Sequence, residues 1–150
     1  RDHHVISNYA DGIDVLLMNN TFAKNGRLIE HRSGSKVSYT LANNVVQEQA
    51  SFDVSSEVMY WDSILERPTL TVSNNILPAK WSAVRDGNEP ASNIYTDTPL
   101  LDPETCAPLP GSPAIDAGAD LSAEFTTDLL GNPRPVGAGF DIGAIEVQAP

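Results

Sequence analysis

The clearest pattern along the chain is an alternation of apolar and polar side chains over residues 36–41. Val37, Tyr39 and Leu41 share one face of an extended chain, and a lysine, a serine and a threonine share the other. A period of two residues is typical of a strand with one buried face. Further strand-like runs, separated by turn-forming clusters, cover residues 5–7, 13–18 and 27–30.

An Asn-Asn pair recurs three times, each time after a run of apolar and β-prone residues and before a β-branched residue. The pairs are Asn19 with Asn20, Asn43 with Asn44, and Asn74 with Asn75. The two intervals between pairs are similar, and the second is longer than the first by seven residues. This self-similarity predicts a solenoid, in which stacked rungs set asparagine above asparagine in a hydrogen-bonded ladder.

We therefore predict an all-β chain, a right-handed parallel β-helix of about four rungs over residues 1–100, with loop excursions at about 47–67 and 78–91. From about residue 98 onward, prolines punctuate the chain and exclude regular central strand, because proline cannot donate to a ladder. Residues 101–150 are predicted to form a capping segment that covers the final rung. The alternative is a β-sandwich in which Asn-Asn marks surface turns.

The charge balance limits the choice of partners. The 150 residues hold 20 acidic and 9 basic side chains, a formal net charge of −11. This argues against nucleic acid or an anionic membrane surface as the main partner. No apolar run is long enough to predict a membrane span. Cys106 is the only cysteine, so an internal disulfide is excluded.

Basic residues cluster in one stretch of this acidic chain. Lys24, Arg27, Arg32 and Lys36 are four of the nine, and His31 lies among them. Stacked rungs that align them in a groove would suit an acidic polysaccharide. A lyase acting on uronic acids needs a cation at the carboxylate (Arg27 or Arg32) and a base for the C5 proton (Lys36, Lys24 or His31). The alternative is a solvated polar face beside the strands.

Three aromatic residues lie in the two predicted loop excursions: Tyr60, Trp61 and Trp81. Exposed aromatic rings beside a groove can stack on sugar rings, which makes these three residues candidates for substrate binding. The alternative is that they are buried and anchor the loops to the core.

Three blocks near the end of the chain occur in order: LPGSPAIDAGAD at 109–120, TDLLGNPRP at 127–135 and FDIGAIE at 140–146. Together they closely resemble the C-terminal end of bacterial secreted right-handed parallel β-helix proteins of the choice-of-anchor type. The resemblance implies the fold and secretion. It does not fix an activity, because such proteins include polysaccharide lyases, glycoside hydrolases, adhesins and other surface proteins.

The charged residues of these blocks have two interpretations. Arg134 is expected to pair with Asp128, Asp141 or Glu146 and so to lock the segment. Alternatively, Asp116, Asp128, Asp141 and nearby carbonyl oxygens would form a calcium site, because calcium prefers hard oxygen ligands. The spacing matches no EF-hand loop.

Two classes of function follow. The first is an extracellular β-helix that binds or degrades an acidic polysaccharide, as a lyase or a glycoside hydrolase. The second is a non-catalytic structural or adhesive module at the cell surface, assembled with other β-helical chains. Rung-like sequence begins almost at residue 1, so we expect the first rung to pack against an N-terminal β-helical partner.

Overall fold

The computed structural model describes residues 4–8, 12–25, 27–32, 37–48, 58–61, 68–81 and 92–148. All regular secondary structure in these ranges is β-strand, which confirms the prediction of an all-β chain. No helix that could cross a bilayer is found there. The strands are β1 His4–Asn8, β2 Asp14–Met18, β3 Thr21–Asn25, β4 Arg27–His31, β5 Ser38–Ala42, β6 Val45–Glu48, β7 Met59–Trp61, β8 Thr69–Ser73, β9 Ile76–Leu77 and β10 Ile94–Tyr95.

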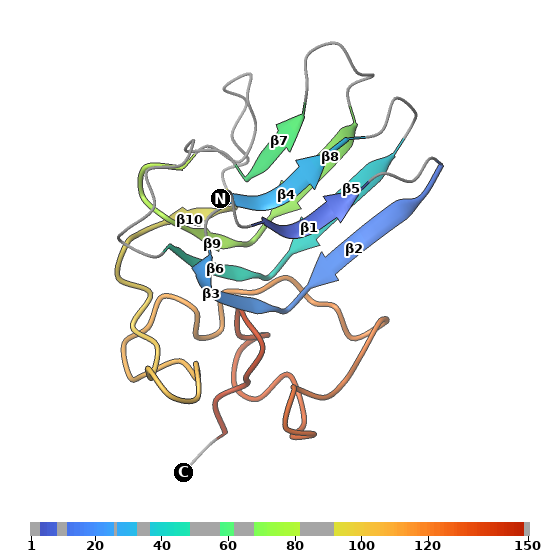
Figure 1. The fold of residues 1–150 in the computed structure, drawn as a ribbon. Coiled ribbons are helices and arrows are strands. Elements are labelled where there is room, and N and C mark those ends of the chain that lie inside the picture. The colour runs from blue at the N-terminus through green and yellow to red at the C-terminus, as the bar shows by residue number, and fades with distance from the viewer. Residues whose placement is uncertain are drawn as a thin grey trace.

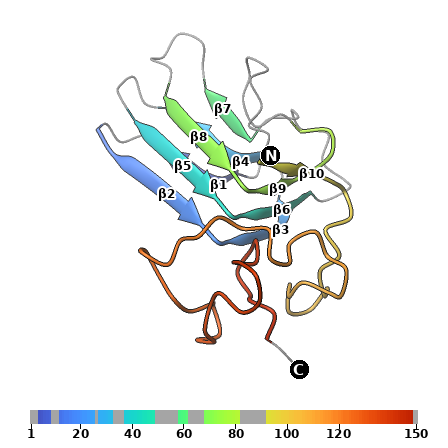
Figure 2. The same ribbon diagram turned by 180° about the vertical axis from the view of Figure 1, so that it is seen from behind.

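The strands form three sheets, and the chain visits the sheets in turn (Figures 1 and 2). The sheet orders are β1-β4-β7, β2-β5-β8 and β10-β9-β6-β3, and every pairing within them is parallel. We call each passage through the three sheets a layer. The first layer is β1–β3, the second β4–β6 and the third β7–β9, and β10 belongs to a fourth.

The strand register reproduces the spacing of the Asn-Asn pairs. Asp14 pairs with Ser38, and Ser38 pairs with Thr69. Along the β2-β5-β8 sheet, neighbouring layers are therefore 24 and then 31 residues apart, the same separations as between Asn20, Asn44 and Asn75. The longer interval falls mostly between β6 and β7, inside the predicted excursion at 47–67. Within that excursion, however, Met59–Trp61 returns to the stack as β7 and pairs with β4.

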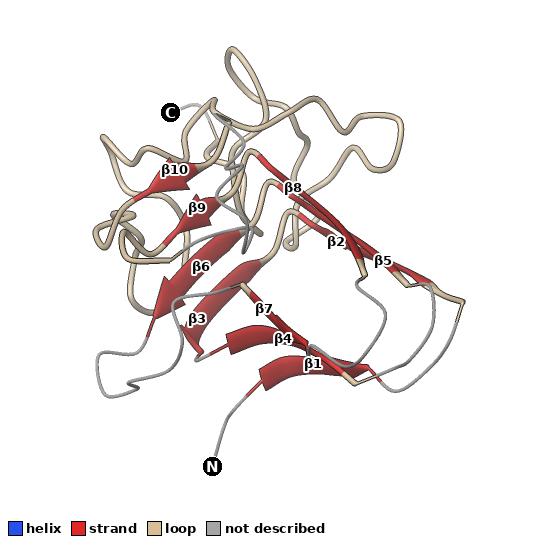
Figure 3. Ribbon diagram, turned by 90° about the horizontal axis from the view of Figure 1, so that it is seen from above, coloured by secondary structure: helices blue, strands red, loops and turns tan. Residues whose placement is uncertain are grey.

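The three sheets face one another around a common interior (Figure 3). Side chains from all three sheets form one buried cluster there. Val37, Tyr39 and Leu41 are at most 2% exposed, which confirms the face that the alternation predicted. They pack with apolar side chains from the other two sheets. Strict alternation holds over residues 37–41, whereas the adjacent residues Leu28 and Ile29 of β4 are both fully buried. The further members of this cluster are Leu28, Ile29, Val46, Val58, Met59, Val72, Leu77 and Trp81.

Residues 96–148, which we call the tail, follow the last of the ten strands (Figure 1). The tail is held by isolated antiparallel bridges, including Gly118 with Phe140 and Thr127 with Pro133. Its apolar side chains cover the outer face of the β3-β6-β9-β10 sheet, where Val45 and Ile76 are fully buried against Ala114 and Ile142. This sheet is therefore buried on both faces, like the central sheet of a layered domain.

Candidate functional site

The second asparagine of each pair forms a ladder along the stack. Asn20 donates from Nδ2 to Oδ1 of Asn44 at 3.1 Å, and Asn44 donates to Oδ1 of Asn75 at 2.9 Å. Asn75 continues the ladder to Oδ1 of Asn93 at 3.2 Å. The backbone N–H of each of these three donors reaches the same oxygen. The repeated Asn-Asn pair thus builds the predicted side-chain ladder, and Asn93 adds a fourth member.

The first asparagine of each pair makes the bend and holds the tail. Asn19, Asn43 and Asn74 have φ values of 50°, 56° and 52°, a left-handed conformation that asparagine tolerates better than most residues. Their Nδ2 groups donate to backbone carbonyls of the tail at 2.8 to 3.4 Å. Those carbonyls belong to Asp141 and Gly143 for Asn19, to Ala119 for Asn43 and to Ala117 for Asn74.

The tail therefore runs along the turns of three layers and is not confined to the end of the stack. Two glycines allow the close approach. A Cβ added to Gly118 would lie 2.9 Å from the Asn43 amide nitrogen, and one added to Gly143 would lie 2.9 Å from Thr21 Oγ1. Thr21 in turn accepts a hydrogen bond from the Ala144 N–H. Side chains at either glycine would push the tail off the stack.

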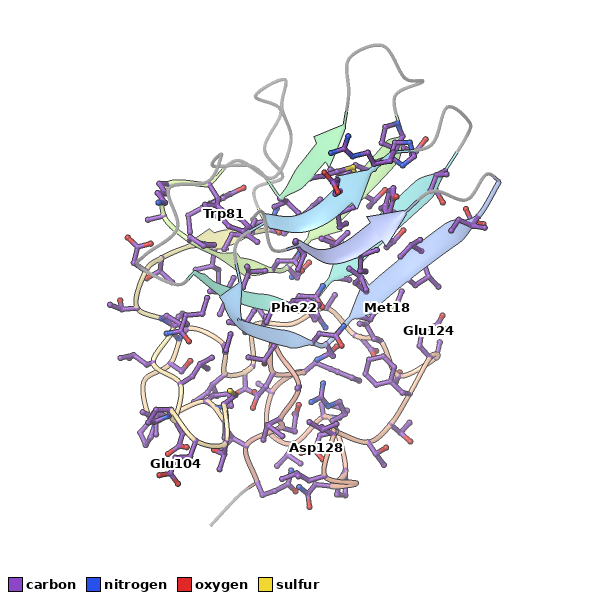
Figure 4. All side chains as sticks on the ribbon, in the orientation of Figure 1. Met18, Phe22, Trp81, Glu104, Glu124 and Asp128 are labelled. Carbon is purple, nitrogen blue, oxygen red and sulfur yellow. The ribbon has the colours of Figure 1, made fainter. Side chains whose placement is uncertain are left out.

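A cavity of about 360 Å³ lies where the tail meets the first layer. Its walls are residues 18–22 of the first layer and, from the tail, Phe125, Asp128, Leu129 and Arg134 among others. Met18 and Phe22 lie at the edge of the first layer, and Asp128 lies beyond them in the tail (Figure 4). The cavity thus combines apolar walls with asparagine side chains, the mixed lining typical of binding sites.

Arg134 is the buried centre of the tail. Its Nε lies 3.5 Å from Glu146 Oε2, and both side chains are at most 1% exposed. Its terminal nitrogens donate to the Gly143 carbonyl at 3.3 Å. The guanidinium carbon lies 5.9 Å from the Phe125 ring centroid and 5.8 Å from that of Phe140, within cation–π range. Of the three predicted acidic partners, Glu146 is the one within ion-pair distance.

The three candidate calcium ligands accept hydrogen bonds from backbone N–H groups. Asp116 Oδ1 accepts from two successive amides at 138 and 139, and Asp141 accepts from the amides of Asp116 and Val147. Asp128 Oδ1 accepts from two amides of the turn it precedes. Among the described residues, no three His, Cys, Asp or Glu side chains are grouped to hold a metal ion. These carboxylates therefore fix the loops of the tail.

Burial shifts the titration of this cluster. Desolvation raises the pKa of Glu146 and of Asp141 above their ordinary values, although backbone hydrogen bonds and Arg134 oppose the shift. Desolvation also lowers the pKa of Arg134, and the neighbouring carboxylates oppose that change. For Asp128, desolvation is outweighed by the hydrogen bonds from Asn132, Glu146 and Leu130, which lower its pKa.

These shifts predict that the protein is most stable in mild acid. Glu146 and Asp141 favour the folded state below about pH 4, and this contribution is lost as pH rises through their raised pKa values. Asp128 favours the folded state above about pH 4, and its contribution is lost as pH falls through its lowered pKa. When the melting temperature is measured from pH 3 to pH 8, it should therefore pass through a maximum at a mildly acidic pH and fall on both sides of it.

The control for this prediction is Glu146→Gln. It removes one of the two carboxyl groups whose raised pKa stabilises the folded state at low pH. Its melting temperature should change less between neutral pH and the maximum than that of the wild type. General repulsion in an acidic chain is shared by both proteins and cancels in the comparison. Parallel pH curves for the two proteins would show that Glu146 has no part in the effect.

The side chains of two members of the basic cluster, His31 and Arg32, are described, and they lie in different surroundings. His31 is fully buried and its Nδ1 lies 3.0 Å from the hydroxyl oxygen of Tyr39, inside the core. Arg32 donates to Glu30 Oε1 at 2.6 Å. Lys24 lies in β3 and Arg27 in β4, but their side chains are outside the described part, and so is all of Lys36. Alternation along β4 does not single out His31, because Leu28, Ile29 and Glu30 are buried as well.

Of the candidate sugar-stacking residues, Trp81 is 4% exposed and belongs to the core cluster. It occupies the anchoring role that was the alternative. Tyr60 and Trp61 lie in β7, and their side chains fall outside the described residues. Sequence reasoning missed the roles of Asn93 in the ladder and of Phe125 beside Arg134. The similarity of Asn93-Ile94-Tyr95 to Asn75-Ile76-Leu77 is the signal for the first.

Comparison with known proteins adds no relative to this description. No protein-family model, no curated protein and no solved structure matches the chain. The geometry of the described residues is therefore the basis for the functional proposal.

Proposed function

We propose that the chain is a right-handed parallel β-helix that serves as a non-catalytic structural or adhesive module, secreted or displayed at a cell surface. The strand order supports the fold, because the chain returns to each of three parallel sheets in turn. Parallel crossovers are right-handed in nearly all known sheets. The β-helix has about four rungs, held by the Asn20–Asn93 ladder, and the tail covers one of its sheets.

The observation that carries the non-catalytic assignment is the position of the basic residues. A polysaccharide lyase requires a cation and a base that both reach the substrate. His31 instead packs inside the core against Tyr39, and Arg32 is paired with Glu30. The charged centre at Arg134 is likewise buried and holds the tail. These placements support an architectural role for the described charged groups.

The extracellular location is supported by the resemblance of the tail sequence to the C-terminal blocks of secreted β-helix proteins. The net charge of −11 also suits a surface module that avoids nucleic acid. The tail explains physically why such blocks would accompany this fold. It supplies hydrogen-bond acceptors to the asparagine turns and apolar cover to a sheet.

The test is incubation of the protein with polygalacturonate and with alginate, two acidic polysaccharides. Ultraviolet absorbance of unsaturated uronate would report lyase activity, and a reducing-sugar assay would report hydrolysis. We expect neither signal above that of a heat-unfolded sample. Turnover that is lost in Lys24→Ala or Arg27→Ala, but retained in the exposed-site control Lys80→Ala, would overturn the assignment in favour of a carbohydrate-active enzyme.

A further inference from the structure

The asparagine turns repeat one hydrogen-bonding pattern from layer to layer. The residue after each ladder asparagine donates its N–H, at 2.8 Å, to the carbonyl of the ladder asparagine in the preceding layer. The same preceding asparagine donates its own amide groups to the Oδ1 of the following one. The N–H donors are Val45 to Asn20, Ile76 to Asn44, and Ile94 to Asn75.

At the first layer this pattern is left incomplete. Asn44, Asn75 and Asn93 each accept at Oδ1 from the layer before, but Oδ1 of Asn20 accepts no hydrogen bond from any residue that the structure describes. Thr21 in β3 is the register partner of Val45 in β6. Because the backbone N–H groups along a parallel strand point alternately to its two sides, the N–H of Thr21 points away from β6. Within the described part of the chain, Asn20 and Thr21 therefore present an acceptor and a donor without partners on the same side of the stack.

Core side chains of the first layer are incompletely covered. Val15, Leu17 and Phe22 point into the interior from the first layer, yet they are only partly buried. Their register partners in the second layer, Tyr39, Leu41 and Val46, are at most 1% exposed. At the other end the ladder closes on Asn93, which is buried at 8% exposure. Leu70 and Tyr95 at the other end are likewise only partly buried, so what distinguishes the first layer is its incomplete asparagine ladder.

The tail and the first layer together form a cavity beside this end of the stack. The cavity of about 360 Å³ is lined by both open residues, Asn20 and Thr21, and by Phe22 from the interior. Its far wall includes Leu129, which is 76% exposed. Leu129 is therefore an apolar side chain that an occupant of the cavity could contact.

We propose that this cavity is a socket for the asparagine turn of a neighbouring parallel β-helical rung. The incoming asparagine would donate to Oδ1 of Asn20 and accept from the N–H of Thr21, as each layer does with the next. The apolar residues before its turn would cover Val15 and Leu17. This inference rests on the proposed β-helix and names its partner. A second copy of this chain is a poorer occupant, because the opposite end of its ladder is buried at Asn93.

The test adds one rung of known sequence to the whole chain. Residues 14–37 are duplicated in tandem before Asp14, because Asp14 and Ser38 are register partners one layer apart. We expect amide hydrogen exchange in β3, at Thr21 above all, to slow at least tenfold when the added turn fills the socket. Unchanged exchange in β3, with the added rung open to proteolysis, would overturn the proposal.

Two neighbouring leucines give a matched control. Leu129 lines the cavity, whereas Leu130 is similarly exposed, at 70%, and is not one of its lining residues. In the duplicated chain, Leu129→Asp should reduce the gain in protection by at least half and Leu130→Asp should leave it intact. Equal effects of the two variants would contradict the socket. A wild-type dimer that is lost only in Leu129→Asp would assign the socket to a second copy and overturn the choice of partner.

These outcomes are distinct from a failure of the proposed function. Degradation of polygalacturonate or alginate would remove the non-catalytic assignment and leave the docking result unaffected. Failure of the added rung to dock would remove the socket, and the absence of turnover would still support a structural module.

Discussion

Replacing Asn44 with alanine is expected to lower the free energy of unfolding by roughly 3 to 5 kcal/mol, a large share of the stability of a typical domain. Asn44 is fully buried and donates to the carbonyl of Leu17 and to Oδ1 of Asn75. Its own Oδ1 accepts both amide groups of Asn20. Removal of the side chain therefore leaves several buried polar groups in the middle of the stack without hydrogen-bond partners. Each such group costs free energy. Urea unfolding monitored by circular dichroism measures the effect.

Asn74→Gly is the matched control for this prediction. Asn74 belongs to the same repeat, but its side chain is only partly buried and makes a long 3.4 Å hydrogen bond. Its φ of 52° is one that glycine adopts readily. The loss for Asn74→Gly should stay within about 1 kcal/mol. If the two variants lose similar stability, the ladder is not the main contribution of the asparagine pairs.

The second large effect concerns Arg134. Arg134→Met is expected to cost about 3 to 5 kcal/mol, because it leaves the Glu146 carboxylate buried without its cation. Methionine retains much of the packing between Phe125 and Phe140, so the loss reports mainly the charge. Hydrogen exchange in the tail, followed with urea unfolding, should show that residues 112–146 lose protection first.

The double variant Arg134→Met with Glu146→Gln separates charge from packing. Glutamine is neutral, and its single side-chain oxygen can keep one of the two hydrogen bonds that the Val136 and Asp141 amides make to separate oxygens of Glu146. The double variant should therefore be more stable than Arg134→Met alone. Acid should also restore part of the stability of Arg134→Met, because the pKa of Glu146 is already raised. A double variant that is less stable than Arg134→Met would contradict this account.

The stack could be predicted from the sequence because its determinants are local and repeated. The alternation at Val37, Tyr39 and Leu41 fixes which face is buried. The spacing of the Asn-Asn pairs equals the strand register between layers. Left-handed turns explain why asparagine stands first in each pair, and the ladder explains why it stands second.

The position of the tail could not be predicted in this way, because it depends on contacts between distant parts of the chain. The hydrogen bond from Asn19 to Asp141 spans 122 residues, and that from Asn43 to Ala119 spans 76. No local pattern tells which layer a tail residue meets. The same holds for Arg134, whose choice of Glu146 over two other acids follows from the folded path of residues 140–146.

The candidate chemistry was the least predictable part, because clustering in sequence does not ensure clustering in space. His31 and Arg32 are adjacent, but His31, the last residue of β4, enters the core, whereas Arg32 follows the strand and pairs with Glu30. Conversely, the residues that line the cavity come from 18–22 and 125–144 and share no motif. Their proximity results from the tail lying along the first layer.

The central claim is that layers of strands are joined through buried asparagine side chains. Nuclear magnetic resonance of the Asn44 and Asn75 side-chain amides tests it most directly. The account predicts that both NH₂ groups exchange with solvent at least a hundredfold more slowly than a free asparagine, with couplings to the carbonyls of Leu17 and Leu41. Side-chain amides that exchange at the rate of a free asparagine, in a protein that is otherwise folded, would contradict it.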